Sequence, residues 1–99
     1  MAKYFNITGE LTQELVLPQN NVPVSSIHFT NIEGTYKCTV DLYIKQATSI
    51  DKFYLLKGVE LPIGSTLVYN NVKFDKQFGL YIKLNKSASE TPAVDVIIR

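Results

Sequence analysis

Few residues in this chain have side chains suited to acid–base or nucleophilic chemistry. There is one histidine, His28, and one cysteine, Cys38. His28 alternates with the apolar residues Ile27 and Phe29, which predicts a strand whose imidazole points to solvent. A general base also needs a partner held within hydrogen-bond reach, and the sequence does not indicate one. Cys38 is in phase with Val40, which predicts a buried small apolar side chain rather than a reactive thiol.

Metal and cofactor chemistry is equally poorly supported. The nine acidic residues are scattered and do not form a calcium-loop spacing, and one Cys with one His cannot complete a four-ligand zinc site. The chain lacks a glycine-rich phosphate loop, a GxSxG elbow and an HExxH pair. Metal-binding cupins use several histidines, so that enzyme class is disfavoured. We therefore predict no enzyme, no catalytic or metal-binding residues and no cofactor.

Three tyrosines are the more informative side chains. Tyr43 and Tyr81 occupy the polar phase of strands whose other phase is apolar, and Tyr54 lies between Phe53 and Leu55. Outward tyrosines bury a large area at low entropic cost, which is typical of protein–protein interfaces. The alternative is that they form cross-strand pairs that stiffen an exposed face. Tyr43, Tyr54 and Tyr81 are the candidate protein–protein contacts.

Alternating apolar and polar residues predict the strands that position these tyrosines. The clearest strand spans residues 36–45, and the same alternation marks 78–84 and 94–98. Weaker strands are expected over seven further segments: 4–8, 12–17, 25–31, 53–56, 59–63, 65–69 and 72–74. The inward phase of the strands gives a predicted core: Ile27, Phe29, Cys38, Val40, Leu42, Ile44, Phe78, Leu80, Ile82, Leu84, Val94, Val96 and Ile98.

Turn signals separate these strands. Gly9–Glu10 is expected to close a hairpin between the first two strands, and Lys57–Gly58 is expected to end the strand over 53–56. The segment 59–63 contains a proline, which predicts an edge strand or an extended loop. Residues 85–92 form the longest polar loop.

The spacing of these elements predicts the fold class. No window carries a helical apolar stripe, and turn signals recur about every 8–12 residues, as in an all-β sandwich or barrel. We predict a single antiparallel β-sandwich domain over residues 1–99, immunoglobulin-like, with a jelly roll as the alternative. Residues 1–24 either belong to this sandwich or form an N-terminal arm that crosses to a neighbour. The last strand pairs inside the sandwich or adds to another subunit's sheet.

The charge balance argues against several partner classes. Ten Lys and Arg stand against nine Asp and Glu, a net charge of +1, so we expect no nucleic-acid partner. Aromatic residues interleaved with Lys37, Lys45 and Lys83 leave a single-strand stacking platform as a disfavoured alternative. No apolar run reaches the roughly 18 residues of a membrane helix, and no signal-peptide pattern opens the chain. We expect synthesis in a reducing cytoplasm and no membrane partner.

Three phrases of the sequence resemble a known group of proteins. Residues 26–31 read SIHFTN, residues 39–44 read TVDLYI, and residues 53–68 read FYLLKGVELPIGSTLV. Together they resemble small β-sandwich virion proteins of tailed bacteriophages. The resemblance covers roughly residues 25–99 and leaves the first 24 unmatched.

The resemblance implies a non-enzymatic structural component of a phage particle. The expected role is a capsid decoration (cement) protein, or a head–tail or tail-attached component, acting through multivalent protein–protein contacts. The implied partners are other virion proteins such as major capsid, neck or tail subunits, with homo-oligomers or many copies per particle. The implied location is the virion, assembled in the host cytoplasm. The alternative function is a small carbohydrate- or host-surface-binding module that uses the loop over 85–92.

Overall fold

The computed structural model describes residues 3–10, 12–16, 24–46, 48–70, 72, 74, 77–86 and 91–99. These residues form eight strands and no helix, and so contain no helix that could cross a membrane. The strands are β1 (Lys3–Thr8), β2 (Thr12–Val16), β3 (Ser26–Asn31), β4 (Cys38–Gln46), β5 (Phe53–Leu61), β6 (Thr66–Asn70), β7 (Phe78–Lys86) and β8 (Ala93–Ile98).

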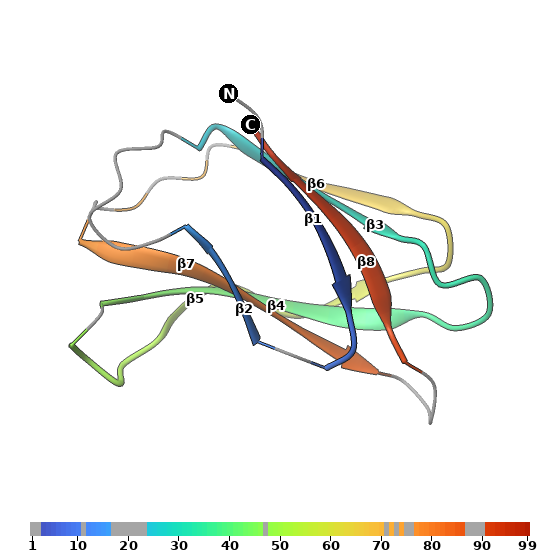
Figure 1. The fold of residues 1–99 in the computed structure, drawn as a ribbon, viewed down its shortest axis with the longest axis horizontal. Coiled ribbons are helices and arrows are strands. Elements are labelled where there is room, and N and C mark those ends of the chain that lie inside the picture. The colour runs from blue at the N-terminus through green and yellow to red at the C-terminus, as the bar shows by residue number, and fades with distance from the viewer. Residues whose placement is uncertain are drawn as a thin grey trace.

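The strands form two antiparallel sheets that pack face to face (Figure 1). We call the sheet with the order β1-β8-β3-β6 sheet A, and the sheet with the order β2-β7-β4-β5 sheet B. All six strand pairings are antiparallel. The predicted antiparallel β-sandwich is therefore confirmed.

The order of the strands is that of a jelly roll. The chain pairs β1 with β8, β2 with β7, β3 with β6 and β4 with β5, like one long hairpin wrapped around a core. Among the described strands, only β4 and β5 are both consecutive and paired, and every other connection changes sheet. The immunoglobulin-like order keeps several consecutive strands as neighbours in one sheet, and it is not the order observed. The alternative architecture, the jelly roll, is the one present.

The first connection differs from the predicted hairpin for the same reason. β1 lies at an edge of sheet A and β2 at an edge of sheet B, so Gly9–Glu10 carries the chain between sheets. Gly9 adopts a φ of 97°, which glycine tolerates without steric cost, and its N–H donates to the carbonyl of Pro92 at 2.8 Å. The prediction of a hairpin turn at this point is therefore wrong.

The segment 53–61 is one strand rather than two. Val40 pairs with Val59 but Leu42 pairs with Leu56, so Lys57 and Gly58 both lie opposite the residue between them, Asp41. This arrangement is a β-bulge, and Gly58 accommodates it at a φ of 62°. The predicted break at Lys57–Gly58 is thus a bulge inside β5, and β5 is an edge strand of sheet B.

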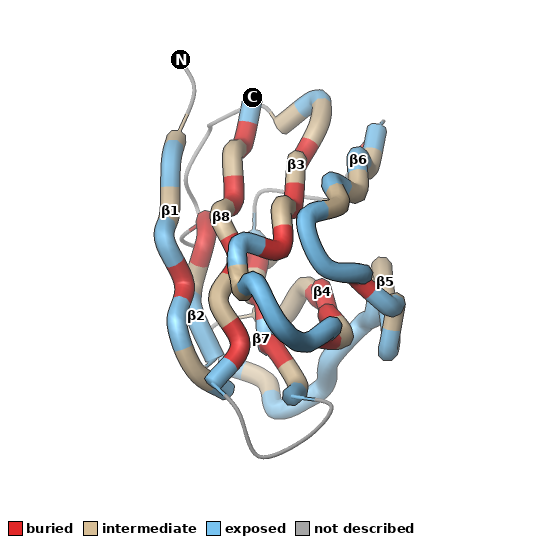
Figure 2. Tube along the Cα trace, turned by 90° about the vertical axis from the view of Figure 1, so that its right-hand side faces the viewer, coloured by how far each residue is buried: buried red, intermediate tan, exposed pale blue. Residues whose placement is uncertain are grey.

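The core between the sheets follows the predicted alternation. Figure 2 shows buried and less buried residues alternating along β3 and β8. The predicted inward residues are buried, except for Ile44 and Phe78 at the end of the sandwich, which are half-buried. β8 lies between β1 and β3, so the last strand pairs inside its own sandwich.

Parts of some predicted segments lie outside the described residues. Of residues 1–24, the described stretches 3–10 and 12–16 contribute an edge strand to each sheet. The loop over 85–92 is described only at 85–86 and 91–92, and the strand expected over 72–74 only at residues 72 and 74.

A buried asparagine at the end of β3 ties the two sheets together. The side chain of Asn31 donates to the carbonyl of Leu61 at 2.9 Å and to that of Tyr36 at 3.2 Å. Its Oδ1 accepts a hydrogen bond from the N–H of Glu33 at 2.9 Å. The ends of β3 and β5 therefore meet at one end of the sandwich, which we call the Asn31 end, and the β4–β5 turn lies at the opposite end (Figure 1).

We expect Asn31→Ala to lower the free energy of unfolding by about 2–3 kcal/mol. The residue is 1% exposed, so its loss leaves three backbone groups without their protein partner in a site that water barely reaches. Urea denaturation followed by circular dichroism measures the change. Thr30→Ala, one residue earlier on the outer face, is the matched control, and an equal loss in both variants contradicts this interpretation.

Candidate functional site

The three predicted tyrosines lie side by side across the outer face of sheet B. Tyr43 of β4 is directly opposite Tyr54 of β5 on one side and Tyr81 of β7 on the other. Both pairs of ring centroids are 5.4 Å apart, with Tyr81 stacked on Tyr43 at 11° and Tyr54 tilted at 56°. The structure thus brings all three together as cross-strand pairs, the alternative that the sequence left open.

The three rings differ in how much of each a partner could reach. Tyr43 faces away from the core as predicted, but it is 5% exposed because its neighbours cover it. Tyr81 is half-buried, and Tyr54 is 43% exposed at the edge of the sheet. Tyr43 and Tyr81 therefore pack against their neighbours within the outer face of sheet B, and Tyr54 is the ring that a partner could contact.

A lysine ammonium lies over each of the three rings. The Nζ of Lys57 is 4.5 Å from the centroid of Tyr54, that of Lys52 is 5.0 Å from Tyr43, and that of Lys45 is 5.7 Å from Tyr81. Attraction between a cation and the ring face favours these positions. Of the lysines singled out in the sequence, Lys45 takes part, whereas Lys52 and Lys57 were missed because the β4–β5 turn and the bulge place them.

Tyr81 is anchored by an acidic residue on the edge strand β2. Its hydroxyl donates to Oε2 of Glu14 at 2.8 Å. Burial raises the pKa of Tyr81 to about 12, together with the hydrogen bond to Glu14 and the negative charge of that carboxylate. Because the folded protein holds this proton more tightly than an unfolded tyrosine with a pKa near 10, stability is lost as the pH rises above about 10.

We expect Glu14→Gln to lower the pKa of Tyr81 toward its ordinary value, because the variant removes the charge that opposes phenolate formation. Ultraviolet difference titration of the phenolate band measures the shift. A Tyr81→Phe variant identifies the titration step that belongs to this ring. Overlapping titration curves for the wild type and Glu14→Gln contradict the assignment.

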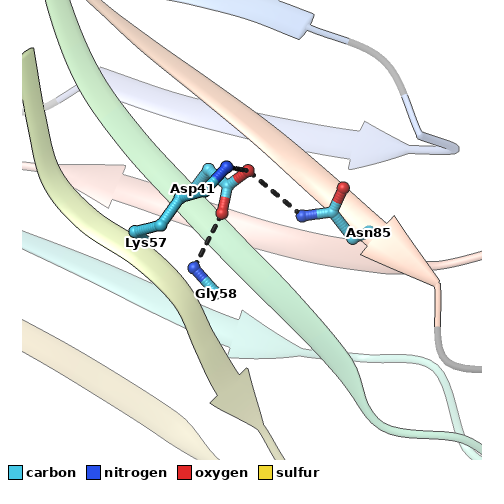
Figure 3. Close-up of polar contacts among 4 residues, drawn as sticks. All are labelled: Asp41, Lys57, Gly58 and Asn85. Atoms are coloured by element: carbon cyan, nitrogen blue, oxygen red, sulfur yellow. Dashed lines mark hydrogen bonds and ion pairs between the residues drawn. The ribbon is translucent and has the colours of Figure 1, made fainter.

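The buried carboxylate of Asp41 accepts hydrogen bonds from three neighbouring residues on the outer face of sheet B (Figure 3). Oδ1 of Asp41 accepts the N–H of Gly58 at 2.7 Å, and Oδ2 accepts hydrogen bonds from Asn85 at 3.3 Å and Lys57 at 3.4 Å. Burial alone would raise the pKa of Asp41, but these hydrogen bonds and the positive charge of Lys57 outweigh it and lower the pKa. The same hydrogen bond and charge raise the pKa of Lys57. Asp41 thereby fixes the bulge that holds Lys57 over Tyr54.

Asp41 is one of the nine scattered acidic residues of the sequence, and its pattern alone does not predict this role. The sequence shows that Asp41 lies between Val40 and Leu42 on the strand expected over 36–45. Only the structure shows that this strand, β4, has a neighbour on each side, which covers the carboxylate. The partner Gly58 was assigned to a turn, so the bulge that supplies the N–H was not predicted.

Exposed apolar side chains gather near the start of β5. Ile50 is 92% exposed and Phe53 is 56% exposed, and both lie within four residues of Tyr54 in the sequence. Phe53 is opposite Ile44, which packs against the core, and Tyr54 is opposite Tyr43, so these two side chains leave opposite faces of β5. The ring of Phe53 packs edge-on against Phe78 at 6.0 Å, which holds it in place. We call Ile50, Phe53 and Tyr54 the β4–β5 tip. A second exposed apolar group, Ile32, Tyr36 and Ile63, lies at the Asn31 end.

The remaining chemistry-bearing residues occupy separate places. Cys38 is buried in the core, as predicted. His28 is half-buried on the outer face of sheet A, opposite Ile97 and Val68 on the neighbouring strands. Within the described ranges, no group of three or more His, Cys, Asp or Glu residues is placed to hold a metal ion.

Comparison with models of known protein families and with curated protein sequences finds no match for this chain.

Proposed function

We propose that this chain is a non-enzymatic structural component of a tailed-phage particle. In this role it is a capsid decoration protein, or a head–tail or tail-attached protein, that occurs in many copies and binds other virion subunits. The β4–β5 tip, defined by Ile50, Phe53 and Tyr54, is the contact surface.

The exposed tip carries the proposal. Three large side chains are exposed at this end of sheet B, Ile50 in the β4–β5 turn and Phe53 and Tyr54 on the two faces of β5, and together they offer apolar area to a partner. Two residues of this tip are held by packing: Phe53 by Phe78, and Tyr54 by Tyr43 and Lys57. Side chains that are already ordered lose little entropy on binding, so even a small contact contributes affinity.

Two further observations support the same role. The phrases at 26–31, 39–44 and 53–68 resemble small phage virion proteins. They form β3, most of β4, and β5 with the turn that leads to the first residues of β6 in the other sheet. The strand order is that of a jelly roll, an architecture found in viral capsid domains and also in lectins. The fold therefore supports a capsid role by analogy. Weak single contacts become strong when many copies bind one lattice.

The experiment is to purify particles of the phage that carries this chain and to measure its amount relative to the major capsid protein by mass spectrometry. We expect a fixed ratio that survives a high-salt wash, since apolar contacts are not screened by salt. Absence from washed particles overturns the proposal. Absence from particles together with retention on a polysaccharide array favours the carbohydrate-binding alternative.

A further inference from the structure

The four edge strands of the sandwich are not equally protected against pairing with another chain. In sheet B, the register of β2 shifts between Glu14 and Val16, and β5 carries two register shifts against β4. Such irregularities hinder the addition of a further strand. In sheet A, the edge strands β1 and β6 run in continuous register with their neighbours. Sheet A is therefore the sheet whose edges can accept a strand.

The hydrogen bonds of β8 show which groups of β1 face outward. Arg99 exchanges hydrogen bonds with Ser26 of β3, so the odd-numbered residues of β8 bond toward β3 and the even-numbered ones toward β1. Gly9 donates to Pro92, in agreement with this alternation. The odd-numbered residues of β1 therefore bond inward to β8. The N–H and C=O groups of Tyr4, Asn6 and Thr8 point away from the sheet.

No strand pairs with this outer edge of β1 within the part of the chain that the structure describes. Four of the six residues of β1 favour strands, namely Tyr4, Phe5, Ile7 and Thr8, and the one charged residue, Lys3, stands at the start. Tyr4 is 72% exposed on the outer face beside it. A regular edge of this kind is a template for strand addition.

We propose that the β1 edge binds the β1 edge of a second copy, antiparallel and across a two-fold axis at Asn6. This register places Asn6 of one copy opposite Asn6 of the other, and Tyr4 opposite Thr8. Every outward N–H and C=O of Tyr4, Asn6 and Thr8 then gains a partner in the second copy. It joins two copies of sheet A into one continuous sheet. Side chains on the outer face of one sheet A lie opposite outer-face side chains of the second copy. On the inner face, Phe5 of one copy lies opposite Ile7 of the other.

Charge selects this arrangement over the parallel one. With the axis at Asn6, Lys3 of one copy lies opposite Gly9 of the other, next to exposed Glu10. The Glu10 carboxylate already accepts the N–H of Lys86 and lies 3.8 Å from the Lys86 Nζ, so Lys3 would join this pair as a second cation. A parallel pairing in register would instead bring the two Lys3 ammonium groups together. The other regular edge, β6, has no charged residue in its strand TLVYN that would fix a register. The inference rests on the geometry of the edges and is independent of the proposed function.

The test measures the mass of the full chain in solution by light scattering over a range of concentrations. We expect a dimer of twice the 11.2 kDa chain mass. Asn6→Pro removes one outward N–H and leaves the ladder to β8 intact, so we expect a folded monomer. Val68→Pro is the matched control, because it removes an outward N–H from the opposite edge of the same sheet, and it should remain a dimer. Near-ultraviolet circular dichroism verifies that both variants fold.

Charge reversal at the axis tests the register without proline. Asn6→Lys and Asn6→Asp each place like charges opposite each other. The Asn6 side chain contacts Asp95 of the same copy, so Asp95 adds to the repulsion in Asn6→Asp and offsets part of it in Asn6→Lys. We expect Asn6→Asp to raise the dissociation constant of the dimer by at least about tenfold and Asn6→Lys to raise it by less. Mixing the two variants should restore the dimer, because the charges then attract. A monomeric wild type, loss of the dimer in Val68→Pro but not in Asn6→Pro, or no restoration on mixing overturns the proposal.

Discussion

Removing residues 93–99, which comprise β8 and the final Arg99, is expected to abolish cooperative folding of the chain. β8 is hydrogen-bonded on both sides, to β1 and to β3, so its loss splits sheet A. It also removes Val94, Val96 and Ile98 from the core, where each is at most 1% exposed. Burial of one aliphatic side chain contributes about 1.5–3 kcal/mol to the free energy of unfolding. The contribution of three such side chains is a large part of the total free energy of unfolding of a small domain. Circular dichroism and a urea titration measure the loss.

A pair of point variants keeps this prediction testable if the shortened chain aggregates. Ile98 lies in the core and the adjacent Ile97 lies on the outer face, so they are chemically identical and differ only in direction. We expect Ile98→Ala to cost about 2–5 kcal/mol and Ile97→Ala less than about 1 kcal/mol. Equal costs, or a sigmoidal unfolding transition in the shortened chain, contradict the central position of β8.

Asp41→Ala is expected to lower the free energy of unfolding by about 2–3 kcal/mol. The variant leaves the N–H of Gly58 and the amide of Asn85 without their acceptor on the packed outer face of sheet B. It should also free Lys57 from its place over Tyr54. Urea denaturation measures the stability, and the fluorescence of the tyrosines reports the change in the ring cluster.

The pH dependence gives a second readout for Asp41. Its pKa in the folded protein lies below the usual 3.8, so its stabilisation is fully present above about pH 4. That stabilisation is lost as the pH falls through the folded pKa, because both states then carry the proton. The difference in stability between the wild type and Asp41→Asn should therefore shrink below about pH 4. A difference that stays constant down to pH 2 contradicts a charged Asp41.

Two controls separate the buried carboxylate from an ordinary surface ion pair. The Lys57 side chain is 64% exposed and that of Asp41 is 7% exposed, so removing the lysine should cost less than removing the aspartate. The pair between Lys37 and Glu60 lies nearby with both side chains 55% exposed. Glu60→Gln should therefore change the stability by less than about 1 kcal/mol.

The sequence predicted the local elements well because alternation directly reports which face of a strand is buried. The strands 36–45 and 78–84 were found as β4 and β7, and Cys38, Leu42 and Leu80 lie in the core as expected. The strand order could not be predicted in this way. A jelly roll and an immunoglobulin-like sandwich share the same alternation and turn spacing, and they differ in which strands become neighbours.

Only part of the candidate site could be predicted, because the rest depends on which strands become neighbours. The outward phase of Tyr43 and Tyr81 was visible in the sequence, but the coverage of Tyr43 depends on the strands beside it. The bulge at Gly58 and the hydrogen bonds of Asn31 and Asp41 also arise from contacts between distant segments. Polar residues that fix a fold through such contacts give no periodic signal.

The measurement that tests the central claim most directly is the incorporation of two matched variants into particles. One variant carries Ile50→Ser, Phe53→Ser and Tyr54→Ser at the β4–β5 tip. The other carries Ile32→Ser, Tyr36→Ser and Ile63→Ser, which removes three exposed apolar side chains from the Asn31 end. Near-ultraviolet and far-ultraviolet circular dichroism verify that both variants fold, because Phe53 also packs against Phe78 and Tyr54 against Tyr43.

Each variant is supplied to infected cells in place of the wild-type chain, and its amount on washed particles is measured by mass spectrometry. We expect the tip variant to fall by more than about tenfold while the Asn31-end variant stays at the wild-type level. Normal incorporation of the tip variant, or loss of the Asn31-end variant alone, contradicts the assignment of the contact surface to Ile50, Phe53 and Tyr54.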